Sequence, residues 1–194
     1  MSKRICLIEG HPDTSEERFG HAIANAYAQA ARDAGHELRT LRVGELDFPF
    51  IRSQSEWLHE TPPPDIVGAQ EDIRWANHLV LVFPLWLGAM PALLKAFLEQ
   101  TLRPGFAIPE GEAASPFAGL LKGRSARIFV TMGMPAFFYR AVYRAHSLKA
   151  LERNILRFAG IKPIRSSVIG MVEQSERGRR RWLERAARLG GGGR

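Results

Sequence analysis

The run "HLVLVF" at residues 78–83 constrains the fold of this chain more than any other feature. A strand that is apolar on both faces is typical of the centre of a parallel sheet, where helices cover both sides. Four further apolar runs predict strands, so the chain should build one sheet of five. These runs lie at residues 3–8, 36–43, 125–131 and 164–170.

Apolar residues recur at helical spacing between these strands. One predicted helix carries a buried stripe of Leu148, Leu151, Ile155 and Phe158 and ends at Gly160. The other predicted helices are Glu16–Ala34 followed by Gly35, a helix from an Asp65 N-cap to about Asn77, a helix that starts at Pro91, and 175–189.

Alternating strands and helices predict an α/β fold whose parallel sheet lies between two helical layers. Five such units in 194 residues match the flavodoxin-like three-layer sandwich with strand order 2-1-3-4-5. We expect a single domain over residues 1–194, with long irregular segments at about 44–64 and 103–123, which are rich in proline and glycine.

The net charge of +7 is concentrated at one end of the chain. Residues 149–194 carry twelve Lys and Arg against four Asp and Glu, or +8, and the other residues sum to −1. The single cysteine, Cys6, excludes an intramolecular disulfide. The sequence shows no long apolar segment and no signal peptide, so we expect a cytoplasmic protein.

Three loops should meet at one site, because ligands of this fold sit at the carboxyl ends of strands 1, 3 and 4. These loops read "EGHPDTSEERFGHAI", "FPLWLGAMP" and "TMGMPAFFYR". The first leads into a helix N-terminus, which favours phosphate. The second presents Trp86 to a flat aromatic ligand, and the third has Gly133 where backbone approaches a ligand closely. No metal-binding spacing and no nucleic-acid motif occurs.

Over nearly its whole length, the chain resembles the flavodoxin-fold NAD(P)H:quinone oxidoreductases. This family includes the quinone reductases, the bacterial modulators of drug activity and the ancillary reductases of potassium efflux. The resemblance lies in "GHP", "ERFGHAI", "FPLWLGAMPALLKAFLEQTLRPGFA" and "TMGMP…Y". It implies a non-covalent flavin, FAD or FMN, with NAD(P)H as co-substrate, a quinone-like acceptor and a homodimer.

Carried over by position, the resemblance assigns three groups of residues to the flavin. It also makes Tyr139 the active-site tyrosine and places His146 near the active-site histidine. The phosphate end would contact His11, Ser15, Arg18 and Phe19, the ring would be bordered by Pro84, Leu85, Trp86 and Leu87, and its polar edge would meet Thr131, Met132, Gly133 and Met134.

A second function stays open at this stage. Relatives in the same family are ancillary subunits of glutathione-regulated potassium-efflux transporters, and the basic segment "ERGRRRWLERAARLGGGGR" would suit an acidic partner. A final helix that buries Trp182, Ala186 and Leu189 and leaves its arginines solvated explains the same segment. The sequence does not distinguish FAD from FMN or NADH from NADPH.

Overall fold

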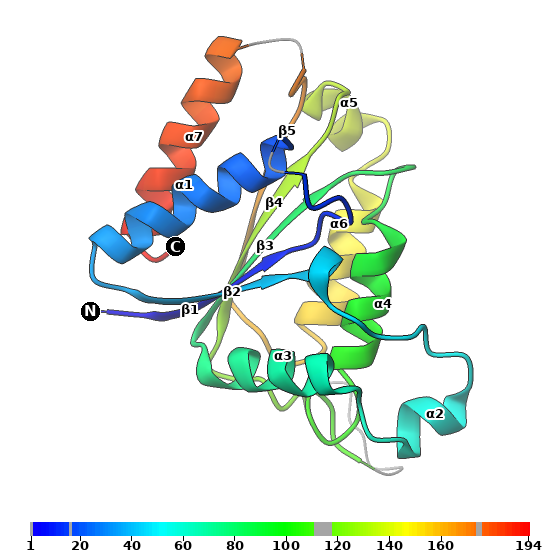
Figure 1. Ribbon diagram of the computed structural model, residues 1–194. Helices are drawn as coiled ribbons and strands as arrows, with labels where there is room; N and C mark the ends of the chain where they lie inside the picture. The colour runs from blue at the N-terminus through cyan, green and yellow to red at the C-terminus, as the bar shows by residue number, and fades with distance from the viewer. Residues whose placement is uncertain (1, 16, 111–117, 174–175) are drawn as a thin grey trace.

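A five-stranded parallel sheet of order β2-β1-β3-β4-β5 forms the centre of the protein, which confirms the predicted flavodoxin-like architecture (Figure 1). The computed structural model describes residues 2–15, 17–110, 118–173 and 176–194. The strands are β1 (Arg4–Glu9), β2 (Glu37–Arg42), β3 (His78–Pro84), β4 (Ser125–Thr131) and β5 (Ile164–Ile169).

Helices cover both faces of the sheet (Figure 1). On one face lie α1 (Phe19–Asp33) and α7 (Glu176–Gly191). The other elements are η1 (Val43–Glu45), α2 (Gln54–His59), α3 (Pro64–Trp75), α4 (Ala92–Thr101), α5 (Ala136–Ala141), α6 (His146–Ala150) and the π-helical segment η2 (Leu151–Leu156). None of the helices described is both long and apolar enough to cross a membrane.

The central strand has the double burial that its sequence predicts. Every residue of β3 is buried, and successive side chains enter two different clusters. Val80 and Val82 pack with α1 and α7, whereas Leu79 and Leu81 pack with α3, α4 and α6. Side chains that alternate across a strand therefore join the two helical layers.

The first helix begins later than its sequence predicts. Residue 16, the predicted start, lies outside the described residues, and α1 starts at Phe19. Before α1, the carboxylate of Asp13 accepts a hydrogen bond from the Ser15 N–H and closes a local turn over residues 13–15. Short acidic side chains often stabilise such turns at the expense of helix.

The segment 44–64, predicted to be irregular, contains the helix α2. Ser53 caps this helix by accepting a hydrogen bond from the Glu56 N–H at 3.1 Å. Asp65 is not the N-cap of α3, since Pro63 occupies that position and Asp65 lies in the first turn. Its carboxylate instead accepts a hydrogen bond from the Asp47 N–H and holds the segment against α3.

The helix predicted to end at Gly160 forms as α6 followed by η2. Arg144 and Ala145, with φ of 50° and 49°, separate it from α5. Leu148 and Leu151 are buried as predicted, but Phe158 is 38% exposed and lines a surface cavity. The π-helical turns shift the helical periodicity and thereby rotate Phe158 off the buried stripe.

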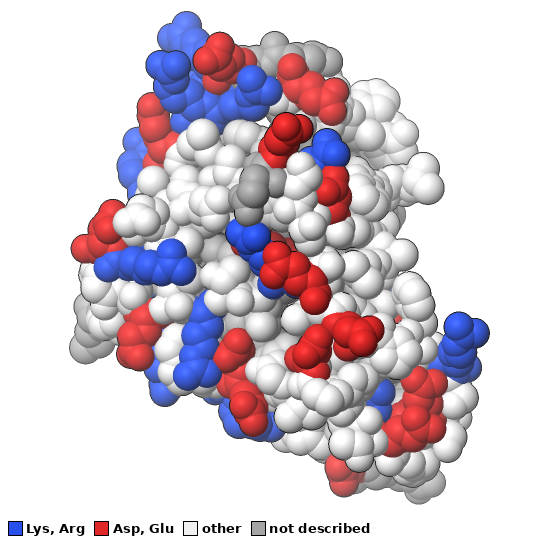
Figure 2. Space-filling view, viewed as in Figure 1, with Lys and Arg blue, Asp and Glu red and all other residues white. Residues whose placement is uncertain are grey.

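The basic C-terminal segment forms α7, which packs along α1. Ala186 is fully buried between them, and Trp182 and Leu189 pack at the edge of the same cluster. Lysine and arginine side chains gather over one end of α7, whereas charges of both signs are interspersed on the rest of this face (Figure 2). The solvated-helix interpretation therefore accounts for the basic segment.

Candidate functional site

The carboxyl ends of the strands surround a cavity of about 550 Å³. Three loops predicted from the sequence contribute to it, together with the segment between β5 and α7. Its lining residues are His11, Asp13, Glu17, Arg18, Phe19, Gly20, Pro84, Leu85, Trp86, Thr131, Met132, Gly133, Val172, Glu173 and Arg179. The volume falls within the range of small-molecule and cofactor sites.

Asp13 organises the first loop. One carboxylate oxygen accepts the Ser15 N–H at 2.9 Å, and the other accepts from Nε of Arg18 at 2.7 Å. These two interactions hold the pKa of Asp13 below its usual value, the backbone hydrogen bond contributing most. The ion pair places the half-exposed Arg18 guanidinium at the mouth of α1, where the helix dipole also favours an anion.

His11 lies between this loop and the second. Its Nδ1 accepts the Asp13 N–H at 3.0 Å, so a proton on the neutral ring is on Nε2. Partial burial, reinforced by the nearby His21, lowers the pKa of His11, which keeps the ring neutral. The edge of the ring meets Trp86 with the centroids 5.6 Å apart. His11 therefore offers one N–H donor beside an aromatic wall.

A buried pair supports the loop from below. Nδ1 of His21 lies 2.5 Å from a carboxylate oxygen of Glu9, and both side chains are 3% exposed. Nε2 of the same ring lies 2.9 Å from the carbonyl oxygen of Asp13. The Arg42 guanidinium lies 3.5 Å from the other Glu9 carboxylate oxygen. The end of β1, the loop and the start of α1 are thus tied together.

The second and third loops present backbone and aromatic surface. Trp86 and Ala89 exchange two backbone hydrogen bonds, which forces Leu87 and Gly88 into left-handed conformations. Within the described residues, the Gly133 N–H has no hydrogen-bond partner. A Cβ added to Gly133 would meet no atom within 4 Å, so its backbone faces open space.

Most residues predicted to bind the cofactor do line the cavity, and three do not. Those that line it are His11, Arg18, Phe19, Pro84, Leu85, Trp86, Thr131, Met132 and Gly133. Ser15 is beside it, with its N–H used by Asp13. Leu87 is fully exposed and does not line the cavity. Met134 packs against the core and accepts the Met171 N–H through its carbonyl.

Tyr139 and His146 do not line this cavity. Tyr139 is 1% exposed, and its hydroxyl lies 2.8 Å from the Ser147 hydroxyl and accepts the Leu148 N–H at 3.3 Å. It joins α5 to α6 instead. His146 begins α6 with an exposed side chain, because the left-handed Ala145 turns the chain away from α5. The two residues are therefore not brought to the proposed flavin site.

The sequence-based analysis missed two parts of the site. The segment after β5 contributes Val172, Glu173 and Arg179, although the rule that ligands meet the carboxyl ends of strands applied to it equally. It also missed the pair of Glu9 and His21. An acidic residue ending a buried strand would have been the signal, because such a group requires a buried partner.

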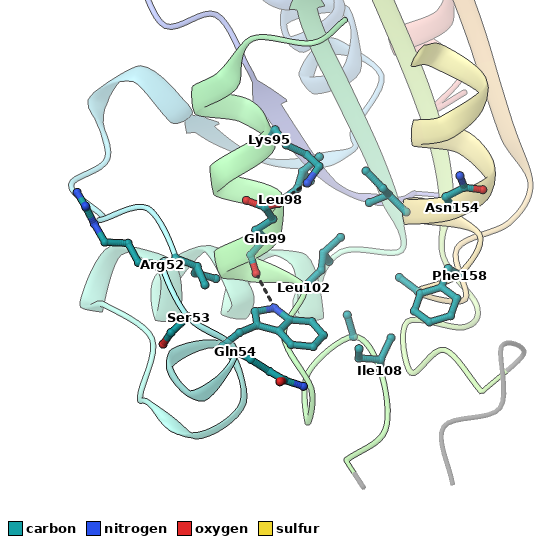
Figure 3. A pocket seen from close by; sticks show the side chains of 15 residues that line it. Arg52, Ser53, Gln54, Lys95, Leu98, Glu99, Leu102, Ile108, Asn154 and Phe158 are labelled. Carbon is teal, nitrogen blue, oxygen red and sulfur yellow. Dashed lines mark hydrogen bonds and ion pairs between the residues drawn. The ribbon is translucent and has the colours of Figure 1, made fainter. Parts of the chain in front are cut away.

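A second cavity of about 580 Å³ shares no residue with the first (Figure 3). The segments 51–57 and 107–108 form part of its wall, opposite α4 and residues 154–159. Trp57 lines this cavity and donates a hydrogen bond from its indole N–H to the Glu99 carbonyl at 3.3 Å. This second cavity lies away from the carboxyl ends of the strands, so it is not the candidate catalytic site.

Fold and site together define a flavodoxin-like protein with a ligand cavity at its strand ends. Residues 3–189 match the Flavodoxin_2 model, described as a flavodoxin-like fold. The chain therefore belongs to the Flavodoxin_2 family, and the predicted kinship with flavodoxin-fold oxidoreductases is confirmed.

Two curated relatives and one solved structure are similar over most of the chain. An uncharacterized NAD(P)H oxidoreductase of Haemophilus influenzae is 30% identical, covering 93% of this chain and 91% of that protein. An FMN-dependent NADH:quinone oxidoreductase of Nitratidesulfovibrio vulgaris is 26% identical, covering 85% of each. The structure of an NAD(P)H:quinone oxidoreductase from Methanothermobacter marburgensis has a TM-score of 0.83 at 22% identity, covering all of both chains.

Proposed function

We propose that this protein is an NAD(P)H oxidoreductase that passes two electrons, as hydride, through a bound flavin to a quinone or similar small acceptor. The observation that carries the proposal is the cavity at the strand ends, which nine of the twelve residues assigned to the flavin line. The names of the relatives from H. influenzae and N. vulgaris support the same reaction class.

The residues present fit a flavin, and FMN is the first candidate to test because the N. vulgaris relative is named for it. Arg18 and the first N–H groups of α1 would hold the phosphate. Trp86 would border the ring system, and the unpartnered Gly133 N–H would meet its polar edge. The open space above Gly133 allows that close approach.

Bound flavin supplies hydride transfer between a nicotinamide and an acceptor, and the protein supplies placement and electrostatics. The Gly133 N–H would donate to the ring edge, where negative charge grows on reduction, as donors do in a preorganised oxyanion site. The neutral His11 would add a donor from Nε2. Met132 and Trp86 would exclude water from one side of the reacting atoms.

Purification and flavin titration test the proposal directly. We expect a yellow protein, or a colourless one that quenches FMN fluorescence with saturation and is bleached by NADH or NADPH under anaerobic conditions. Benzoquinone should then restore the colour at one mole per mole of flavin. A protein that binds neither FMN nor FAD would contradict the proposal.

We also propose that the protein forms a homodimer through the apolar surface near the cavity. Leu87, in the turn after β3, is completely exposed. Phe137 and Val142, after β4, are 72% and 60% exposed. Such surface usually marks an interaction site. Light scattering should give twice the chain mass, and Leu87→Asp should give the monomer, unlike the control Leu58→Asp in α2.

A further inference from the structure

A basic pocket of about 250 Å³ lies at the amino ends of the strands, on the opposite edge of the sheet from the flavin cavity. Its lining residues are Lys3, His78, Ser125, Ala126, Pro163, Arg165 and Arg194. None of these described residues is acidic, and three are cationic at neutral pH. The pocket has no role in the proposed reaction.

The register of β4 and β5 places further positive charge on the same face of the sheet. Arg127 is the direct neighbour of Arg165 across β4 and β5. Alternation from Phe129 and Ile169, which pack against α1 and α7, places both arginines toward that layer. Arg127 is 6% exposed, and its Nε has no hydrogen-bond partner in the described part of the chain.

These cations are not neutralised by the protein. Among the described residues, Lys3, Arg127 and Arg165 make no ion pair within 4 Å, whereas several surface arginines do. Burial, and then the positive charges of Arg194 and Arg165, lower the pKa of Lys3. Its ammonium contacts only the Gly193 carbonyl, at 2.7 Å. Within the described residues, the pocket therefore offers donors and positive charge that no acidic side chain pairs with.

His78 supplies an independent sign that an acceptor is missing. The side chain is 3% exposed, and Nδ1 lies 2.7 Å from the Ser125 hydroxyl. Burial, with Lys3, Arg127 and His36 nearby, lowers the pKa of His78 to about 3, so the ring is neutral. A Ser125 hydroxyl that donates to Nδ1 leaves the ring proton on Nε2, which has no partner among the described residues. Buried polar groups are rarely left unpaired.

We propose that this pocket is a second binding site, which takes a small oxyanion of the phosphate or sulfate class between Lys3 and Arg165, beside the buried imidazole of His78. Its volume suits a phosphoryl group rather than a nucleotide. Guanidinium and ammonium groups are the usual ligands of such anions. The oxyanion would relieve the repulsion among the cations and change the electrostatic environment of the buried imidazole.

Inorganic phosphate is the first probe, added to the flavin-saturated protein so that the mouth of α1 is already occupied. Ionic strength is held constant with chloride. We expect a saturable rise in the thermal midpoint with phosphate, and a saturable shift of the His78 Nε2 signal in ¹⁵N-edited NMR. Sulfate should compete. The histidine signal is local, so its response does not depend on the proposed flavin chemistry.

A matched pair of variants separates the pocket from the general basic charge. Arg165→Gln should weaken phosphate binding about tenfold or more, as loss of a charge-assisted contact does. Arg181→Gln removes the same charge from an exposed position on α7 and should change affinity less than about twofold. Equal weakening by both variants, or no saturable response of His78, would overturn the proposal.

A final binding experiment distinguishes a free inorganic anion from a phosphorylated metabolite. Glycerol 3-phosphate carries the same phosphoryl group on a larger body. Tighter binding of this ester than of inorganic phosphate would support a phosphorylated metabolite as occupant. Tighter binding of inorganic phosphate would support the free ion. Failure of every oxyanion to bind would contradict the site itself.

Discussion

Glu9 and His21, both buried, lie 2.5 Å apart, oxygen to nitrogen, close to the loop that lines the cavity at the strand ends. Both nitrogens of the His21 ring face oxygen atoms, since Nε2 is 2.9 Å from the Asp13 carbonyl. These two contacts tie the loop that begins the phosphate end of the site to the end of β1.

Glu9→Gln should therefore affect both stability and flavin binding. Removing one member of a buried ion pair leaves the other charge uncompensated, so we expect a loss of about 3 kcal/mol in the free energy of unfolding. Urea titration measures this loss. Flavin affinity should fall as well, because the Asp13 carbonyl is no longer held. The control Glu45→Gln, at an exposed partner of Arg42, should cost less than about 1 kcal/mol; equal costs would contradict the argument.

Gly133→Ala separates folding from cofactor binding. No protein atom lies within 4 Å of the added methyl group, so the unfolding midpoint should not change. The methyl would enter the space assigned to the flavin edge, and FMN should bind about tenfold more weakly, a loss of ~1.4 kcal/mol. Fluorescence quenching gives the affinity. Gly68→Ala, equally unobstructed but on α3, is the control; unchanged FMN affinity in Gly133→Ala would place the flavin elsewhere.

Tyr139→Phe tests whether the family's tyrosine acts directly. The hydroxyl is buried between α5 and α6 and bonded to Ser147 and Leu148. We expect a stability loss of about 1 kcal/mol. Stopped-flow flavin reduction by NADH should proceed within about twofold of the native rate, a barrier change of at most ~0.4 kcal/mol, because Tyr139 does not line the cavity. Reduction slowed a hundredfold with FMN still bound would restore the direct role.

His78 should make stability depend on pH. Its pKa is lowered from 6.5 to about 3 in the folded protein, so the unfolded chain binds more protons between these values. The contribution of the neutral His78 to the free energy of unfolding is fully present above about pH 6.5. The free energy of unfolding should then fall by on the order of 4 kcal/mol as the pH drops toward 3. His78→Gln should flatten this part of the curve, measured by urea titration across pH. A curve parallel to that of His59→Gln, an exposed control in α2, would contradict the assignment.

The sheet and its order were predictable because burial on both faces leaves few ways to place a strand such as 78–83. Local hydrogen bonds were the harder part. The Ser53 cap that forms α2 and the Asp13 turn that delays α1 each depend on one side chain meeting one backbone group. The hydrophobic periodicity of a sequence does not predict such contacts.

The residues of the candidate site show the same difference between features set by the strands and features set by local contacts. Residues that immediately follow a strand, such as Trp86 and Gly133, line the cavity because the strand ends position them. Tyr139 lies farther along, and its place depends on the break at Arg144 and Ala145, which no pattern in the sequence marks. The pairing of Glu9 with His21 joins a strand to a helix and becomes visible only when both are folded.

The glycines at residues 190–193 look like a flexible tag, yet Gly190 is fixed where α7 crosses α1. A methyl group at Gly190 would lie 2.2 Å from the carbonyl oxygen of Tyr27, closer than atoms can approach. The first and last helices thus pack with their backbones in direct contact. A linker grafted here should therefore extend the chain beyond Gly193 and leave Gly190 unchanged, because any side chain at Gly190 would push α7 away from α1.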